Sequence, residues 1–434
     1  MRTLNYLGCK FKLLDFIEEQ VERVTPKGGG VCDLFAGSGC VAYKLSEHFQ
    51  VTACDIQYYS KVICDALLQQ YNLSDDRIAA FLHALSSERT AVLEDVFSPL
   101  LKEESDALRG KRVDVLADII EHGSMEVFAR EMPRSLILKA QEQVLRNLRL
   151  SGLKNNETFI SRHYGGVYFS YRQAIQIDVI LSAIRELLPE CGRTIFLAAL
   201  LSTASDIVDT VGKHFAQPIK ARNANGSVKS LVYNKAVRDK TLDVKPIFEG
   251  WVRRYASLPR GMYSHRTING DFMDCLQRLP KDVATVYADP PYTRDHYSRF
   301  YHVLETIARG DTPDISTVNV HGIQHISNGL YRKDRHQSPF CIRSKAPSAF
   351  DSMFRTVSAS GRNLLLSYSP YDDTKKTHPR VVTMDLLVSL AKRYFTHMDV
   401  VSAGKFAHNK LNSTAHLLEA SDEAELLIVC TGAA

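Results

Sequence analysis

The sequence predicts an α/β protein whose parallel, Rossmann-like sheet is interrupted by a large helical insertion. Three observations lead to this fold. Residues 1–68 read as strand, glycine turn, helix and strand, which is the βαβ unit of a parallel sheet. Residues 69–261 change to a helical pattern, and from residue 262 short apolar strands alternate with helices again. A sheet that begins before residue 68 and is completed after residue 262 belongs to one discontinuous domain.

The first segment supplies the start of the sheet. Apolar residues at helical spacing predict a helix over residues 11–24. The apolar runs 31–35 and 50–55 predict two strands, and a helix over residues 40–49 connects them.

The insertion reads as helices and loops. Helices are predicted over residues 93–101, 113–122, 135–150, 173–188 and 194–211. Residues 213–240 are predicted to form a basic loop region, with seven Lys or Arg against the single acid Asp239.

The last segment returns to the α/β pattern. Its expected strands are 283–288, 363–368, 396–401 and 425–430. Its expected helices are 272–279, 296–308, 349–359 and 385–394. A long polar and basic loop is expected over residues 309–345.

Composition and charge exclude several classes of protein. The chain has 434 residues, enough for two or three domains, and its 45% hydrophobic and 24% charged residues are typical of a soluble globular protein. A net charge of +5 is too small to identify a nucleic-acid binder by itself. The nine cysteines form no CxxC pair, so we expect reduced thiols in the cytoplasm and no metal site. We recognise neither a signal peptide nor a membrane span.

A glycine-rich turn after the first strand is the candidate cofactor site. In Asp33-Leu-Phe-Ala-Gly-Ser-Gly39, the glycines allow dihedrals that a Cβ would forbid, and the helix that follows offers free N–H groups. Asp55 ends the next strand, where a carboxylate can accept both hydrogen bonds from a ribose diol. Tyr6 and Lys10 precede the first helix, and they suit covering a cofactor with a ring and pairing with its carboxylate.

Two cofactors satisfy this turn. The residues from Gly37 to Ala42 also match the dinucleotide fingerprint G-x-G-x-x-G/A. The turn alone therefore predicts an adenosine cofactor, either a nicotinamide dinucleotide or S-adenosylmethionine.

The sequence Asp289-Pro290-Pro291-Tyr292 directly follows the apolar run 283–288. It combines a carboxylate, a rigid backbone that presents its carbonyl outward and an aromatic face. Hydrogen bonds from an adenine N6 amine to Asp289 and to the Pro290 carbonyl would localise the nitrogen lone pair, and Tyr292 would stack on the base, worth about 1–3 kcal/mol. A base in duplex DNA must flip out to reach such a site. A turn that simply ends the strand is the competing interpretation, and a nicotinamide oxidoreductase has no use for these four residues.

Taken in chain order, these motifs resemble the Dam-like, α-class (D12-type) adenine-N6 DNA methyltransferase family over about half of the chain. The resemblance implies a class I methyltransferase fold with a mixed seven-stranded sheet and S-adenosylmethionine as cofactor. It implies a catalytic domain formed by residues 1–68 and 262–434, and a target-recognition domain formed by residues 69–261. The implied catalytic residues are Asp289, Pro290, Pro291 and Tyr292. The implied cofactor-binding residues are Tyr6, Lys10, Asp33, Phe35, Gly37, Gly39, Asp55, Asp271 and Phe272. Cys9 stands where this family usually has Gly or Ser.

Double-stranded DNA is the expected partner. The basic residues expected to contact its phosphates are Lys213, Lys220, Arg222, Lys229, Arg332, Lys333 and Arg335. For each of them a solvated surface charge is the competing interpretation. We expect a cytoplasmic, nucleoid-associated protein with a cognate restriction endonuclease as a further partner. Methylation of cytosine N4, methylation of adenine N6 in RNA, and a catalytically silent DNA-binding regulator stay open as alternatives.

Overall fold

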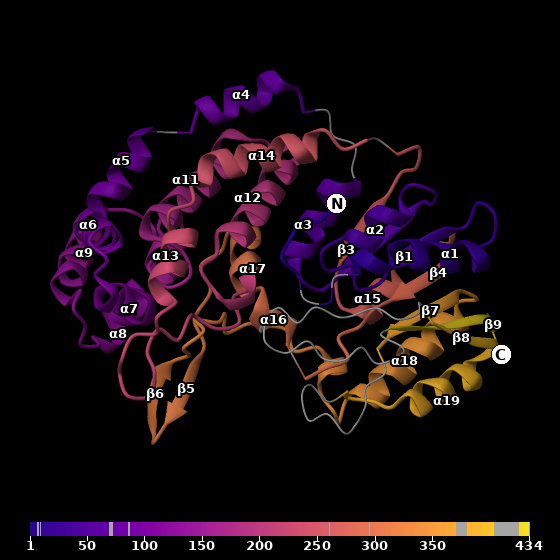
Figure 1. Ribbon diagram of the computed structural model, residues 1–434. Helices are drawn as coiled ribbons and strands as arrows, with labels where there is room; N and C mark the ends of the chain where they lie inside the picture. The colour runs from indigo at the N-terminus through magenta and orange to yellow at the C-terminus, as the bar shows by residue number, and fades with distance from the viewer. Residues whose placement is uncertain are drawn as a thin grey trace. The chain divides into compact units, whose positions relative to one another are not determined.

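The computed structural model describes residues 1–6, 8, 10–68, 73–85, 87–259, 261–294, 296–369, 380–402 and 425–433. The chain divides into two compact units, shown in Figure 1. The first unit comprises Met1–Gln70, Leu258–Ser298 and His336–Ala434, and the second comprises Tyr71–Ser257 and Arg299–Arg335.

The segment Arg299–Arg335 belongs to the second unit. The division predicted from the sequence places it in the domain that contains the sheet. Helix α17 (His302–Arg309) of this segment packs against α12 (Arg193–Ile207) of the helical unit. The buried Tyr168 also donates a hydrogen bond to the carbonyl of Gly329 at 2.9 Å. Apolar packing and buried hydrogen bonds therefore tie this segment to the second unit.

The first unit is built on a seven-stranded sheet. Its strands are β1 (Gly30–Asp33), β2 (Val51–Asp55), β3 (Arg266–Asn269), β4 (Val283–Ala288), β7 (Asn363–Tyr368), β8 (Phe395–Ser402) and β9 (Leu426–Ala433). Their spatial order is β3-β2-β1-β4-β7-β9-β8. The pairs from β3 to β7 are parallel, whereas β9 runs antiparallel to β7 and β8. The predicted mixed sheet is thus confirmed. When only the strands of this sheet are counted along the chain, their order is 3-2-1-4-5-7-6. The dinucleotide-binding fold has the order 3-2-1-4-5-6 instead.

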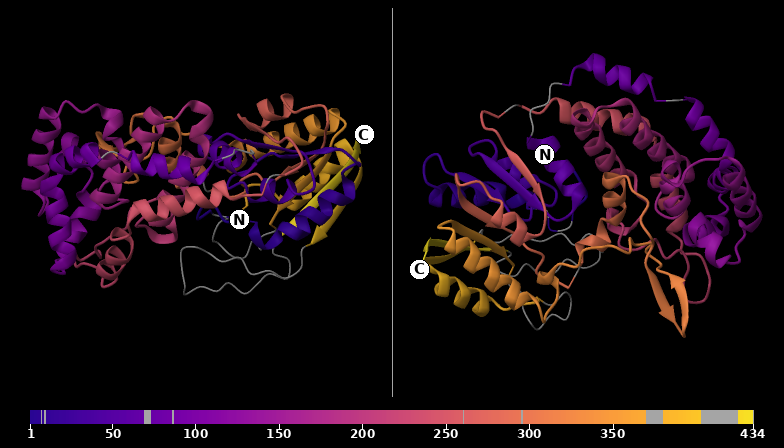
Figure 2. Two further views of the ribbon diagram at one scale, coloured as in Figure 1. Left: turned by 90° about the horizontal axis from the view of Figure 1, so that it is seen from above. Right: turned by 180° about the vertical axis from the view of Figure 1, so that it is seen from behind.

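Helices cover both faces of this sheet, as Figure 2 shows. Because side chains alternate along a strand, every second one points into the same core. On one face that core contains Cys32, Val286 and Leu364 together with residues of three helices. These helices are α15 (Phe272–Gln277), α18 (Ala346–Ala359) and α19 (Met384–Tyr394). The helices on the other face are α1 (Leu14–Val24), α2 (Cys40–Leu45) and α3 (Tyr58–Leu68).

The second unit is helical apart from one hairpin. Its helices besides α12 and α17 are α4 (Asp75–His83), α5 (Ser87–Val96), α6 (Ser98–Arg109), α7 (Val113–His122), α8 (Met125–Glu131), α9 (Leu138–Leu150), α10 (Phe159–Tyr164), α11 (Tyr171–Leu187), α13 (Val232–Lys240) and α14 (Val244–Ala256). The hairpin pairs β5 (Thr317–Val320) with β6 (Ile323–Ile326) in antiparallel fashion. In the part of the chain that the structure describes, no helix is long and apolar enough to cross a bilayer.

Four predicted elements differ from the observed ones. The helix predicted over residues 93–101 is split between α5 and α6. The basic loop 213–240 ends in the helix α13, and the loop 309–345 contains the β5–β6 hairpin. The single helix predicted over residues 296–308 is split into α16 (Tyr297–Phe300) and α17, because Tyr301 between them has a non-helical backbone, with φ −124° and ψ 17°. The two strands of the hairpin have four residues each, and periodicity over so short a run is a weak signal.

Candidate functional site

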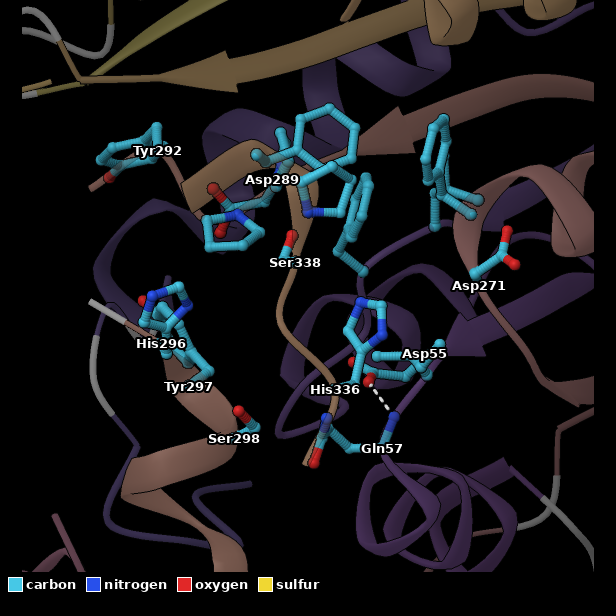
Figure 3. Close-up of a pocket in the computed structure, with 18 of the residues that line it drawn as sticks. Asp55, Gln57, Asp271, Asp289, Tyr292, His296, Tyr297, Ser298, His336 and Ser338 are labelled. Atoms are coloured by element: carbon cyan, nitrogen blue, oxygen red, sulfur yellow. Dashed lines mark hydrogen bonds between the residues drawn. The ribbon is translucent and has the colours of Figure 1, made fainter. Parts of the chain in front are cut away.

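A cavity of about 420 Å³ lies in the first unit, where β1, β2 and β4 end. This is the position at which strand order reverses between β1 and β4, where ligands bind in open α/β sheets. Its size falls within the range of about 300–1,000 Å³ that is usual for small-molecule sites. Figure 3 shows side chains from several segments converging on it. The predicted site residues among its lining are Tyr6, Lys10, Phe35, Asp55, Asp271, Phe272, Asp289, Pro290, Pro291 and Tyr292.

The glycine turn lies directly against Tyr6, which lines the cavity. Gly37 and Gly39 have positive φ angles of +53° and +72°, as a turn between β1 and α2 requires. A Cβ on Gly37 would lie 2.6 Å from the hydroxyl oxygen of Tyr6. The absence of a side chain at Gly37 therefore makes room for the Tyr6 ring against the turn. Neither glycine is itself among the lining residues.

Asp55 is held by two backbone amides. Its Oδ2 accepts a hydrogen bond from the N–H of Gly37 at 2.9 Å, and its Oδ1 accepts one from the N–H of Gln57 at 2.8 Å. The second bond is the dashed line in Figure 3. Asn269 of β3 donates to the carbonyl of Asp55 at 2.9 Å and fixes the main chain there. The carboxylate is thus preorganised at the pocket wall, as a group that receives ribose hydroxyls must be.

Asp33 serves a different purpose from the predicted one. Its side chain is 1% exposed and does not line the cavity. Its Oδ2 accepts a hydrogen bond from the N–H of Ala42 at 3.0 Å, which satisfies a donor in the first turn of α2. Burial, helped by the negative charge of Asp289, raises the pKa of Asp33 to about 8. The Asp33 carboxyl group therefore contacts the α2 backbone and does not line the cavity, so its position does not support the cofactor contact that the resemblance implies for it.

Three phenylalanines form an aromatic wall of the cavity. Phe35 and Phe272 are stacked with ring centroids 6.4 Å apart, and Phe340 meets them edge-on at 5.4 Å and 4.9 Å. Phe340 comes from the long segment after β6, and nothing in its local sequence marks it as a site residue. Asp271 begins α15, and its Oδ1 accepts hydrogen bonds from the N–H groups of Met273 and Asp274 at 2.8 and 3.1 Å.

Asp289 belongs to a buried ion-pair chain. The Nζ of Lys10 lies 3.1 Å from Oδ1 of Asp289 and 2.6 Å from Oε1 of Glu425. The hydroxyl of Ser367 donates to the same Glu425 oxygen at 2.6 Å. Burial alone would lower the pKa of Lys10, but Asp289 and Glu425 outweigh that effect and hold its pKa well above the ordinary value. Lys10 thus has two carboxylate partners within the chain, whereas the sequence predicts that it pairs with the cofactor.

Tyr292 is surrounded by an aromatic ring and two cations. The Tyr368 ring centroid is 5.2 Å from that of Tyr292, the Arg380 guanidinium lies 4.7 Å from it, and the Lys10 ammonium lies 5.6 Å from it. The N–H of Val381 donates to the Tyr292 carbonyl at 3.2 Å. Burial raises the pKa of the Tyr292 hydroxyl, so this ring stays neutral at physiological pH.

The sequence-based reasoning missed Glu425 and Arg380. Glu425 was included only as the first residue of a predicted strand, and Arg380 lies in no predicted element. For Glu425 the available signal was an acid at the start of an otherwise apolar strand. Such an acid is also expected where a strand simply lies at the edge of a sheet. Cys9, the departure from the family pattern, lies outside the described residues.

The seven basic residues predicted to contact DNA fall into two groups. Lys220, Lys229 and Lys333 have exposed side chains. Arg335 is half-buried. The other three are tied into ion pairs within the second unit. They are Lys213 with Asp239, Arg222 with Asp118 and Glu121, and Arg332 with Asp311 and Asp334.

That Lys213, Arg222 and Arg332 contact DNA stays a prediction, with which their ion pairs within the second unit compete. Arg332 is 2% exposed, and its Nη1 lies 2.6 Å from Asp311. A cation that moved from such a site to a DNA phosphate would give up these ion pairs, of which the one between Lys213 and Asp239 involves a buried carboxylate. These three side chains stabilise the second unit.

The sheet order, the antiparallel β9 and a pocket at the switch point are those of a class I methyltransferase. A sequence profile of the D12 class N6 adenine-specific DNA methyltransferases matches residues 6–164 and 254–362, more than half of the chain. The chain belongs to the D12 class N6 adenine-specific DNA methyltransferase family.

Curated relatives agree with this assignment. Modification methylase LlaI of Lactococcus lactis subsp. lactis is 24% identical over 409 residues, which cover 90% of this chain and 49% of the relative. Type II methyltransferase M.FokI of Planomicrobium okeanokoites is 24% identical and covered over 44% of its length. Type II methyltransferase M.NlaIII of Neisseria lactamica is 23% identical and covered over 83%. The chain therefore spans about half the length of the first two relatives.

Proposed function

We propose that this chain transfers a methyl group from S-adenosylmethionine to the N6 amine of an adenine in duplex DNA, after that adenine has flipped out of the helix. One observation carries the proposal. In a member of the N6 adenine-specific family, Asp289 and Tyr292 lie together in the wall of a cavity of small-molecule size.

The lining residues suit this cofactor. Asp55, held by the amides of Gly37 and Gln57, offers acceptors to a ribose diol. The slot beside Phe35, Phe272 and Phe340 suits a planar adenine ring. Because Gly37 has no side chain, the ring of Tyr6 packs against the turn, and Tyr6 lines the cavity. When bound, S-adenosylmethionine supplies an electrophilic methyl group on its sulfonium.

Asp289 and Pro290 would act on the base. The N6 lone pair is delocalised into the adenine ring, and hydrogen bonds from the amine to the Asp289 carboxylate and the Pro290 carbonyl favour a tetrahedral nitrogen. Asp289 orients the amine and needs no strong basicity, because the amine loses its proton only after it has become cationic. Lys10 and Glu425 fix the Asp289 carboxylate, and Tyr292 stacks on the ring. The rate enhancement then comes mainly from positioning and exclusion of water.

The second unit is the candidate target-recognition domain. An adenine inside the duplex cannot present its amine to Asp289, so the protein must hold the DNA around a flipped base. The exposed Lys220, Lys229 and Lys333 supply positive charge for the phosphate backbone. The relatives LlaI and StsI carry the name modification methylase, and a restriction endonuclease with the same target site is the partner we propose on that basis.

The test is methyl transfer from radiolabelled S-adenosylmethionine to unmodified mixed-sequence duplex DNA, followed by nucleoside digestion and mass identification. We expect N6-methyladenine from the wild-type protein and none from Asp289→Ala. N4-methylcytosine would overturn the base assignment, and label in RNA alone would overturn the DNA assignment. Binding of DNA without any transfer would indicate a silent regulator.

A further inference from the structure

Two arginines of the second unit flank one tyrosine ring. The guanidinium carbon of Arg299 lies 4.9 Å from the ring centroid of Tyr331, and that of Arg335 lies 4.6 Å from it. Arg299 also donates a hydrogen bond from Nη2 to the Tyr331 hydroxyl at 3.2 Å. Tyr331 is 6% exposed, and its own hydroxyl donates to the carbonyl of Ala216. The ring is therefore a fixed platform that holds both cations.

The two guanidinium groups differ from that of the neighbouring Arg332 in their polar partners. Within the described residues, neither guanidinium contacts a carboxylate, and Nε of Arg335 donates only to the main-chain carbonyl of Arg332 at 2.8 Å. The neighbouring Arg332 shows the contrast, because Asp311 and Asp334 lie 2.6 and 3.0 Å from its nitrogens. Burial and the like charge of Arg299 lower the pKa of Arg335. Two cations that are held on one ring without a carboxylate partner attract an anion.

We infer that Arg299 and Arg335 form a phosphate clamp, a binding site for one phosphodiester of the DNA backbone. The inference rests on the proposed function. Guanidinium groups present forked donors that match phosphate oxygens, and stacking on an aromatic ring fixes the plane of the fork. Arg299 is exposed and Arg335 half-buried, so solvent reaches the site.

The test compares wild type, Arg299→Gln, and the double variant Arg299→Gln/Arg335→Gln. The matched control is Arg254→Gln, because Arg254 is an exposed arginine of the same unit, stacked 4.5 Å from the Trp251 ring. Affinity for a mixed-sequence duplex is measured by fluorescence anisotropy over a series of salt concentrations. Thermal unfolding and S-adenosylmethionine binding verify that each variant is folded.

We expect the double variant to bind duplex DNA roughly tenfold more weakly at low salt. The slope of log affinity against log salt should become shallower by about 0.9, the value for one phosphate contact. The exposed single variant Arg299→Gln should move in the same direction, which keeps the test decisive if the double variant does not fold. Arg254→Gln should bind as wild type does.

Three results would overturn the clamp. The first is wild-type affinity and slope in folded Arg299 variants, and the second is an equal loss in Arg254→Gln. In the third, inorganic phosphate at matched ionic strength stabilises wild type more than the double variant, while the two proteins bind DNA equally well. That result would indicate a site for free phosphate. Failure of the proposed function is separate, since it appears as absent methyl transfer by the wild-type protein in the same preparation.

Discussion

Lys10 lies 3.1 Å from Asp289, joined to it by a buried ion pair between the first ten residues of the chain and the end of β4. Glu425, just before β9, binds the same ammonium at 2.6 Å. Lys10 therefore fixes the position of the Asp289 carboxylate, which in the proposed function orients the amine. Glu425 in turn fixes the position of Lys10.

These linked ion pairs predict that the effects of two substitutions are not additive, and that the second substitution partly offsets the first. Lys10→Met leaves Asp289 and Glu425 close together with no cation between them, and we expect transfer to fall at least about tenfold and the melting temperature to drop. Adding Glu425→Gln to Lys10→Met should recover part of both losses, because it removes the second negative charge. Single-turnover rates and thermal unfolding of the four proteins measure the coupling. Additive losses would mean that Glu425 does not act through Lys10.

Asp289→Asn tests the role of the carboxylate. The amide has nearly the same shape but no negative charge, so we expect the transfer rate to fall about 10²–10³-fold, the usual effect of losing one key polar group in an active site. Affinity for S-adenosylmethionine should stay within about twofold. The matched control is Asp399→Asn on β8, where the side chain is 71% exposed. A folded Asp289→Asn protein that has lost cofactor binding would refute the assignment of Asp289 to the base.

Asp55→Ala tests the ribose contact. The substitution removes both oxygens that Gly37 and Gln57 hold in place, and we expect the dissociation constant for S-adenosylmethionine to rise roughly tenfold or more. Isothermal titration calorimetry with the cofactor alone measures this without DNA. An unchanged constant would remove Asp55 from the cofactor site.

Gly37→Ala tests the close approach of Tyr6. The new methyl group would meet the Tyr6 ring at 2.6–2.9 Å and would force the ring to move. Gly361→Ala is the matched control, because it has a positive φ of +70° but nothing within 4 Å of the added Cβ. Both variants should lose about 1–2 kcal/mol from backbone strain. Only Gly37→Ala should also weaken cofactor binding, and equal binding by the two variants would count against a role for Tyr6 in the pocket.

Asp33→Asn tests the pH dependence of stability. The folded protein keeps a proton on Asp33 up to its pKa of about 8, whereas the unfolded chain loses that proton above the ordinary value of 3.8. The unfolded state therefore binds fewer protons in this window, so Asp33 makes the free energy of unfolding fall as pH rises from 3.8 to about 8. The loss of stability between pH 5 and 8 should be smaller in Asp33→Asn than in wild type. Identical pH profiles from urea unfolding would contradict the raised pKa.

Local sequence patterns identified much of this fold. The strands β4 and β7 lie at the predicted bounds, 283–288 and 363–368, since each is an apolar run between turn residues. The glycine turn and the tetrad Asp289-Pro290-Pro291-Tyr292 could be predicted because glycines, prolines and acids at the ends of strands can be recognised from the local sequence alone. The hairpin of residues 317–326 left a weaker signal, because each of its strands has only four residues. Its apolar residues Val318, Val320 and Ile323 are also exposed and mark no core.

The amino-acid sequence by itself determined the fold class, the cofactor turn, Asp55 and the tetrad, because these depend on residues within a few positions of one another. Only the tertiary structure decided which groups meet across the chain. Glu425 meets Lys10 from 415 positions away, Phe340 completes a wall begun by Phe35, and Asp33 turns to α2. Arg299 and Arg335 come together on Tyr331 for the same reason. Strand order and loop packing set such distances, and no local pattern records them.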